Sequence, residues 1–119
     1  MEKVTVFHNP RCSKSRAVLA LLEENDISPE IVYYLETPLD SEALEEVLQK
    51  LGMHVRDVLR RSEPEFEALG LEDESLADEI VLDLLVKHPI LLQRPIVIVG
   101  SHAIIGRPPE NVLRFIEEV

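Results

Sequence analysis

The chain has 119 residues, one cysteine and a formal net charge of −11. A single cysteine excludes an internal disulfide, a self-contained pair of redox cysteines and a cysteine-rich zinc site. With 23 acidic residues against 12 basic ones, the surface repels phosphate backbones and anionic membranes, so nucleic acid binding and membrane binding are disfavoured. The apolar fraction of 45% is enough to build a core.

The sequence shows neither a secretory leader pattern nor an apolar run long enough to cross a bilayer. The apolar residues of segment 80–99 are interrupted by charged and polar residues and by Pro89, whereas a membrane-spanning helix needs about 20 mostly apolar residues. We therefore expect a cytoplasmic monomer with a single domain over residues 1–119 and with no bound metal or cofactor.

The first third of the chain predicts a strand, a helix and a second strand. Residues 4–7 are β-branched and aromatic and are followed by Asn9-Pro10, which is typical of a strand that ends in a loop. From Ser13 to Asn25 the apolar residues recur at helical spacing, and residues 31–35 form a second strand-like run. A connection of this length requires the two strands to be parallel.

Helices are predicted over the middle of the chain, about 40–88. Ser41 is expected to cap a helix that ends at Gly52, and the pattern Ser-x-x-Glu at residues 62–65 is expected to cap a second helix. A third helix opens at residues 75–78 and ends before His88-Pro89. The residues expected to face inward from it are Leu76, Ile80, Val81, Leu84 and Leu85.

The last third predicts two strands and a helix. Residues 96–99 and 103–105 flank a glycine-containing turn, which indicates an antiparallel hairpin. A final helix is expected to start at residues 108–110 and to bury Val112, Leu113 and Ile116. The order of elements predicts an α/β fold of thioredoxin-like type: a mixed four-stranded sheet flanked by helices, with the helical insertion between the βαβ unit and the C-terminal ββα unit.

Cys12 lies where the first strand gives way to the first helix, at the edge of the sheet where open α/β folds place their sites. The amino end of a helix presents unpaired amide donors and a partial positive charge, which favour a thiolate. Arg11, Lys14 and Arg16 add cationic charge around it. Because its neighbours are polar or charged, a reactive thiol with a lowered pKa is favoured over an inert buried cysteine.

Two further residues of this turn are expected to support the thiolate. His8 ends the strand, within reach of the thiol, and Ser15 is expected to point its hydroxyl at the sulfur. Arg16 is expected to contribute through its charge.

Arginines next to proline-marked turns predict an anion site. Arg94-Pro95 precedes the third strand and Arg107 follows the fourth. In a thioredoxin-like layout the loop before the third strand lies beside the cysteine turn, and a proline there is commonly cis. Arg60, in the insertion, is the third candidate. Guanidinium groups match the paired oxygens of a tetrahedral oxyanion better than an ammonium group does.

With these residues in place, the sequence resembles the glutaredoxin-linked arsenate reductase family over essentially its whole length. The motifs that carry the resemblance are His8-Asn9-Pro10 before Cys12, Ser15-Arg16 after it, Arg60, Glu63-Pro64, Leu69-Gly70-Leu71, Arg94-Pro95 and Gly106-Arg107-Pro108. The resemblance implies that Cys12 is the nucleophile, that His8 assists formation of the thiolate, and that Arg60, Arg94 and Arg107 bind the oxyanion. Asn9 and Pro95 are expected to be structural residues of the site.

The implied reaction is the reduction of arsenate to arsenite through a covalent Cys12–arsenate adduct. Because the chain has no second cysteine, glutathione would act as co-substrate and glutaredoxin as partner in resolving the adduct. Residues 13 and 14 depart from the Cys-Gly-Thr-Ser-Arg sequence of many members, since Ser13 replaces a glycine and Lys14 adds a charge. The departure bears on the identity of the substrate.

Three alternatives stay open on the sequence. The first is a glutathione-dependent thiol oxidoreductase that acts on mixed disulfides. The second is a non-catalytic regulator of the same fold family that binds RNA polymerase, and the third is an idle domain whose thiol is unperturbed.

Overall fold

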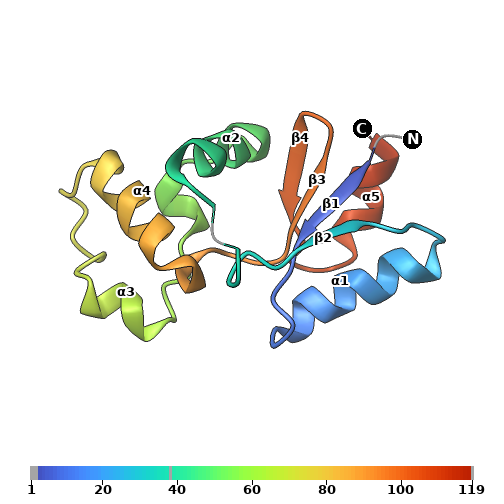
Figure 1. The fold of residues 1–119 in the computed structure, drawn as a ribbon, viewed down its shortest axis with the longest axis horizontal. Helices are drawn as coiled ribbons and strands as arrows, with labels where there is room; N and C mark the ends of the chain where they lie inside the picture. Colours follow the sequence, from blue (N-terminus) through green and yellow to red (C-terminus); the bar gives the residue numbers. More distant parts are fainter. Residues whose placement is uncertain (1–2, 38, 119) are drawn as a thin grey trace. The chain divides into compact units, whose positions relative to one another are not determined.

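The computed structural model describes residues 3–37 and 39–118, which fall into two units (Figure 1). The sheet unit comprises Met1–Thr37 and Arg94–Val119, and the helical unit comprises Pro38–Gln93. The helical insertion expected over about 40–88 therefore corresponds to the helical unit. No helix in the described ranges is long and apolar enough to span a membrane.

Four short strands form the mixed sheet of the sheet unit. They are β1 (Val4–Phe7), β2 (Glu30–Val32), β3 (Ile96–Val99) and β4 (His102–Ile105), in the spatial order β2-β1-β3-β4. β1 is parallel to β2 and antiparallel to β3, and β3 is antiparallel to β4. The predicted mixed four-stranded sheet, including its parallel crossover and its hairpin, is confirmed.

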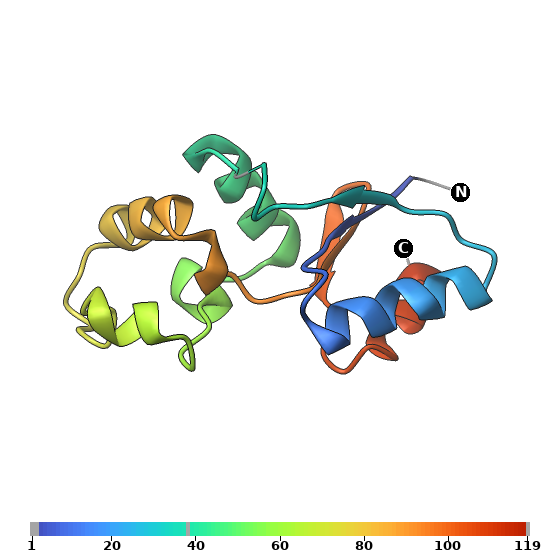
Figure 2. The ribbon, with the colours of Figure 1, turned by 60° about the horizontal axis from the view of Figure 1, so that its bottom comes forward.

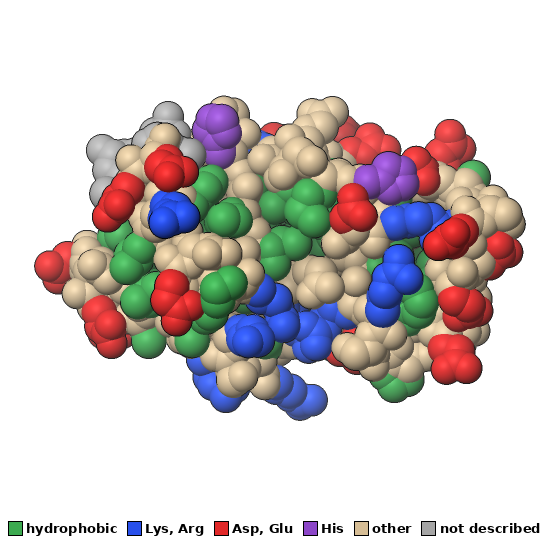
Figure 3. Space-filling model, turned by 180° about the vertical axis from the view of Figure 1, so that it is seen from behind, with side chains coloured by type: hydrophobic (Ala, Val, Ile, Leu, Met, Phe, Trp, Pro, Cys, Tyr) green, Lys and Arg blue, Asp and Glu red, His purple; other side chains and the backbone are tan. Residues whose placement is uncertain are grey.

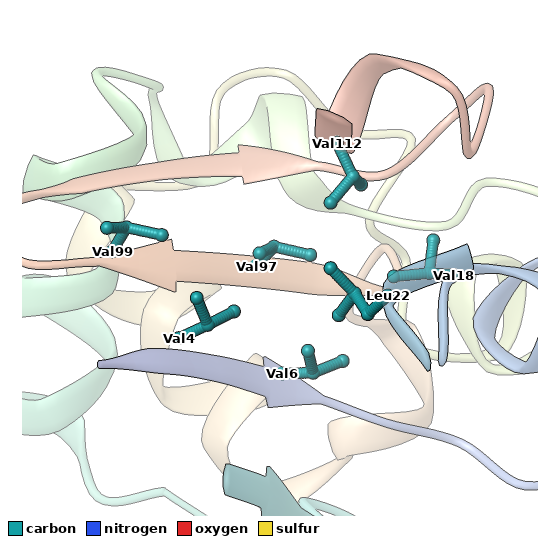
Figure 4. Close-up of a cluster of buried hydrophobic side chains, with 7 residues drawn as sticks. All are labelled: Val4, Val6, Val18, Leu22, Val97, Val99 and Val112. Atoms are coloured by element: carbon teal, nitrogen blue, oxygen red, sulfur yellow. The ribbon is translucent and has the colours of Figure 1, made fainter. Parts of the chain in front are cut away.

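Two helices, α1 (Ser13–Glu24) and α5 (Asn111–Glu118), cover the same face of this sheet (Figures 1 and 2). The core between them is built from side chains that are at most 4% exposed (Figure 4): Val4 and Val6 of β1, Val97 and Val99 of β3, Val18 and Leu22 of α1, and Val112 of α5. The valines alternate along the strands, and Val18 and Leu22 are one helical turn apart, so both periods direct apolar side chains into one layer. This packing fixes the direction in which α1 leaves β1.

Two boundaries in the sheet unit differ from the sequence-based expectation. β2 ends at Val32 instead of continuing to residue 35, because the N–H groups of Glu36 and Thr37 fold back onto the Tyr33 carbonyl and close a turn. The last helix begins at Asn111, since the segment before it forms a turn in which the carbonyls of Pro108 and Pro109 accept from the N–H groups of Asn111 and Val112. Val112 is buried as predicted, whereas Leu113 and Ile116 are half-buried.

The helical unit contains α2 (Ser41–Leu51), α3 (Pro64–Ala68) and α4 (Asp78–Lys87), with 3₁₀ turns η1 (Val55–Val58) and η2 (Pro89–Leu91). Helix α4 packs against α2 and against both 3₁₀ turns. The fully or nearly buried side chains of the helical unit include Leu44, Val47, Val58, Phe66, Val81, Leu85 and Leu91. The segment therefore has an apolar core of its own.

The helix ends in this unit were predicted less well than the helices themselves. Asp40, not Ser41, caps α2, since its Oδ1 accepts from the Ala43 N–H at 2.8 Å. Gly52 ends α2 in the left-handed conformation, as expected, with φ of 65°. The residue at the N-cap of α3 is Glu63, and its side chain makes no capping hydrogen bond, so the predicted Ser-x-x-Glu box is not formed.

The inward orientation predicted for Ile80 is wrong, because its side chain is 50% exposed. Helix α4 begins at Asp78, the last residue of the segment at which the sequence placed its start. Its buried face is centred on Val81, Leu82 and Leu85. Each residue turns the helix by about 100°, so Ile80 lies at the edge of that face.

Gly106, the residue after β4, lies close to α1, α5 and the start of β3. A Cβ atom at this position would lie 2.9 Å from Val18 Cγ2, 3.1 Å from Pro95 Cγ and 3.2 Å from Val112 Cγ2. The Gly106 N–H donates to the Pro95 carbonyl at 2.8 Å. Glycine is therefore required for the chain to pass between α1, α5 and the start of β3.

We expect Gly106→Ala to lower the free energy of unfolding by about 1–3 kcal/mol, because an added methyl group overpacks this contact. Urea denaturation of both proteins measures the difference. The control is Ser101→Ala, an exposed substitution in the β3–β4 turn, which should stay within about 0.5 kcal/mol of the parent. Equal stability of Gly106→Ala and the parent would contradict the prediction.

Candidate active site

Cys12 is the N-cap residue of α1, in the extended conformation with φ of −91° and ψ of 121°. Its N–H donates to the Asn9 carbonyl at 3.0 Å, and its carbonyl accepts from the Arg16 N–H at 3.0 Å. The residue is half-buried. The backbone of Cys12 is thus fixed on both sides, while its sulfur retains access to solvent.

The pKa of the Cys12 thiol lies below its ordinary value. Burial acts to raise this pKa, but it is outweighed by the backbone N–H groups of Ser15 and Lys14 and by the guanidinium group of Arg94, which favour the thiolate. The first turn of α1 contains no acidic residue that would oppose them. The predicted lowering of the pKa by a helix N-terminus agrees with this geometry, whereas the cation that acts on the thiol is Arg94 and not Arg11, Lys14 or Arg16, which were expected from the sequence.

Two loops from the other end of the chain reach the same turn. Arg107 Nη2 lies 3.8 Å from Cys12 Sγ, and Arg107 Nε donates to the Arg94 carbonyl at 2.7 Å. The guanidinium groups of Arg94 and Arg107, which the sequence placed before the third strand and after the fourth, therefore both act at the sulfur. The Arg94–Pro95 bond is cis, as expected, and the Arg107–Pro108 bond is cis as well.

A buried hydrogen-bond network lies beneath the turn. Ser15 Oγ is 2.7 Å from His8 Nδ1 and accepts from the Asn9 N–H at 3.1 Å. All three residues are at most 5% exposed. Burial and the charge of Arg16 lower the pKa of His8 and so favour its neutral ring, in which an unprotonated Nδ1 can accept a hydrogen bond from the Ser15 hydroxyl.

The expected hydrogen bond from the Ser15 hydroxyl to the sulfur is therefore replaced by another arrangement. The hydroxyl is engaged by His8 and Asn9, and Ser15 supports the sulfur through its backbone N–H. The physical reason is that the hydroxyl of a buried serine has to pair locally, and the strand end offers both partners. The network places His8 against Ser15, so its proposed assistance to the thiolate stays a prediction.

The side chains of Asn9, Arg16 and Tyr33 make further contacts at the turn. Asn9 Oδ1 accepts from the Arg11 N–H at 3.0 Å, which supports the structural role expected for Asn9. Arg16 Nη1 donates to the Pro10 carbonyl at 2.7 Å. Tyr33 was missed as a site residue: its ring meets that of His8 edge to face, with centroids 5.8 Å apart. Its only sequence signal was an aromatic residue in the middle of a predicted strand.

Arg60 belongs to the helical unit, where its guanidinium pairs with Glu63 at 3.2 Å. Its backbone N–H donates to the Leu91 carbonyl at 2.7 Å. The role of Arg60 in binding an oxyanion stays a prediction. Within residues 3–37 and 39–118, no group of three or more His, Cys, Asp or Glu side chains is arranged to hold a metal ion.

The surroundings of Cys12 are basic although the chain is strongly acidic. Figure 3 shows Lys and Arg side chains gathered where the amino end of α1 lies, whereas Asp and Glu side chains are spread over other parts of that view. A nucleophilic sulfur beside two guanidinium groups is suited to attack a centre that carries negative oxygens.

We expect alkylation of Cys12 by iodoacetamide to reach half its maximal rate at a pH below the ordinary thiol pKa of about 8.5. The midpoint shifts to lower pH because only the thiolate reacts with iodoacetamide, and a thiol with a lowered pKa forms its thiolate at lower pH. The urea-unfolded chain is the control, and its midpoint should return to the ordinary value. A folded midpoint equal to the unfolded one would contradict the prediction.

Comparison with known proteins places the chain in a family. The model of the ArsC family matches residues 7–115. The chain is 47% identical over 116 residues to the uncharacterized protein YfgD of Escherichia coli K12, covering 97% of this chain and 98% of that protein. It is 44% identical over 113 residues to an arsenate reductase of Neisseria meningitidis, covering 94% and 97% respectively.

Among solved structures, the arsenate reductase from Vibrio cholerae superimposes with a TM-score of 0.91 at 43% identity, covering 95% of this chain and 97% of that chain. This similarity and the sheet order confirm the expected thioredoxin-like α/β fold. The resemblance inferred from the motifs around Cys12 is confirmed too: the chain belongs to the ArsC family.

Proposed function

We propose that the protein is an arsenate reductase that forms a covalent adduct between Cys12 and arsenic. The observation that carries the proposal is the lowered pKa of Cys12 at the start of α1, with Arg107 Nη2 3.8 Å from its sulfur. Relatives named arsenate reductase support it, including the Neisseria meningitidis protein at 44% identity and an Escherichia coli K12 protein at 35% identity over 118 residues.

The first step forms a sulfur–arsenic bond. The Cys12 thiolate attacks the pentavalent arsenic, one arsenic–oxygen bond breaks, and the departing oxygen takes up protons and leaves as water. Negative charge shifts among the remaining oxygens during this step. In this proposal Arg94 and Arg107 neutralise that charge, and the Arg107 guanidinium is held before substrate arrives by its hydrogen bond to the Arg94 carbonyl.

The second step needs another thiol. Reduction of arsenate by two thiols yields arsenite, one disulfide and one water, so two sulfurs supply the electron pair that arsenic gains. One sulfur is Cys12, and the sequence contains no other cysteine. We assign the second thiol to glutathione as co-substrate. A thiol of glutaredoxin then reduces the mixed disulfide and restores Cys12, which is chemistry of the reducing cytoplasm.

The remaining residues of the site have supporting roles in this proposal. His8, Ser15 and Asn9 hold the turn that presents the sulfur, through the buried network around the Ser15 hydroxyl. Arg60 is proposed as the third oxyanion ligand on the strength of the resemblance.

We expect Cys12→Ser to abolish arsenate turnover, because the hydroxyl group cannot replace the thiolate as nucleophile or be oxidised to a disulfide. The measurement is arsenate-dependent NADPH oxidation coupled through glutathione, glutaredoxin and glutathione reductase. The circular dichroism spectrum should stay unchanged, since Cys12 is half-buried and outside the core. Ser101→Ala is the matched control. Turnover by Cys12→Ser at the parent rate would refute the covalent route.

We expect Arg107→Ala to lower kcat/KM for arsenate by about 10- to 100-fold, since it removes one preorganised charge from the reacting oxygens. Arg107→Lys should recover only part of this loss, because an ammonium group lacks the paired donors of a guanidinium. Arg114→Ala, an exposed arginine of α5, is the control for the loss of one positive charge. An unchanged kcat/KM in Arg107→Ala would remove Arg107 from the oxyanion site.

A further inference from the structure

Several cations at the turn around Cys12 have no carboxylate partner among the described residues. Elsewhere, four basic side chains pair with carboxylates, Lys3 with Glu30, Lys50 with Glu46, Arg60 with Glu63, and Lys87 with Asp83, whereas Arg56 donates to backbone carbonyls and Arg61 lies over the Phe66 ring. In the described part of the chain, no carboxylate pairs with Arg11, Lys14, Arg16 or Arg107. With 23 acidic residues available, the absence of neutralising partners at one turn leaves its positive charge for a ligand.

Two of these four cations already have partners in the turn. Arg107 contacts the sulfur and the Arg94 carbonyl, and Arg16 donates to the Pro10 carbonyl. The side chains of Arg11 and Lys14 are exposed, and only their backbone N–H groups take part in the site, toward Asn9 Oδ1 and the Cys12 sulfur respectively. Both residues lie within two positions of the half-buried Cys12 in the sequence, and neither side-chain charge is among the groups that lower its pKa.

We infer that Arg11 and Lys14 select the second thiol: their charges attract a small thiol or disulfide that carries carboxylates, so Cys12 reacts faster with anionic partners than with neutral ones. The inference deepens the proposed function, because it names the class of thiol that meets Cys12. Arsenate itself is served by Arg94 and Arg107, which act at the sulfur.

Long-range electrostatics explain why local cations such as Arg11 and Lys14 are needed to attract an anionic thiol. The net charge of −11 repels a carboxylate-bearing thiol from most of the surface. Screening limits this repulsion to about 8 Å at physiological salt, so nearby cations prevail over distant carboxylates. Local cations of this kind raise the rate of encounter, and they do so less as salt concentration increases.

Exchange between Cys12 and a symmetrical disulfide isolates this selection from arsenate chemistry. The Cys12 thiolate attacks one sulfur of the disulfide, a new sulfur–sulfur bond forms, the original one breaks, and the other half leaves as a thiolate with the electron pair. Cys12 and the retained sulfur end as a mixed disulfide, and the departing half is reduced. Because the chain has one cysteine, the measured rate belongs to Cys12 alone.

The experiment compares two reagents, the dianionic dithiobis(nitrobenzoate) and the neutral dithiodipyridine, in stopped flow at low and high salt. In Arg11→Gln/Lys14→Gln, the rate with the anionic reagent should fall about three- to tenfold at low salt, and the rate with the neutral reagent should change less than about twofold. High salt should narrow the difference. The control, Lys3→Gln/Lys87→Gln, removes two positive charges that are paired elsewhere and should leave both rates near the parent values.

Three results would overturn the inference. An equal fall with both reagents would mean that the two cations act on the thiol itself, and an unchanged anionic rate would mean that they do not act at all. A similar fall in the control would mean that the net charge of the protein, and not the position of the cations, sets the rate.

None of these readouts uses arsenate, so they test the inference even if the protein lacks arsenate turnover. Where turnover is present, KM for glutathione should rise in the double variant, and a rise in KM for arsenate alone would also overturn the inference.

Discussion

The stabilisation of a negative sulfur at the amino end of α1 is the interaction on which the chemistry of this protein depends. Burial of Cys12 works against it, because a half-buried thiol resists ionisation. The backbone N–H groups of Lys14 and Ser15 and the guanidinium of Arg94 reverse that balance. Since these donors are fixed by the helix and by a loop of the same unit, they need no rearrangement when the thiolate forms or when charge moves onto a substrate.

The fold serves this interaction by bringing distant segments to one turn. Arg107 contacts the sulfur although the two residues are 95 positions apart in the sequence. It can do so because Gly106 fits against Val18 of α1 and Val112 of α5, where any larger residue would force the loop away. The apolar core and the reactive turn are thus coupled: packing between α1, α5 and the sheet sets the distance between guanidinium and sulfur.

The charge of the whole chain and the charge around Cys12 have opposite signs. The chain as a whole is acidic, and among the described residues the cations Lys3, Lys50, Arg60 and Lys87 pair with carboxylates outside the turn, whereas the turn around Cys12 keeps cations without carboxylate partners. One set of cations, Arg94 and Arg107, acts at the sulfur, and a second set, Arg11 and Lys14, stays exposed beside it. In the proposed function, this division would separate the binding of a small oxyanion from the approach of the thiol that completes the reaction.

The sequence alone determined the local features of the site. Apolar periodicity and the Asn9-Pro10 break placed Cys12 at the start of a helix, because strand and helix periods depend on neighbouring residues. Only the tertiary structure decided which partner each polar side chain takes: the Ser15 hydroxyl turns to His8, and Arg107 reaches the sulfur. It also left Ile80 exposed, since burial depends on packing against segments that the local pattern does not contain. Hydrogen-bond partners are chosen among groups that folding brings together, and no spacing rule along the chain specifies them.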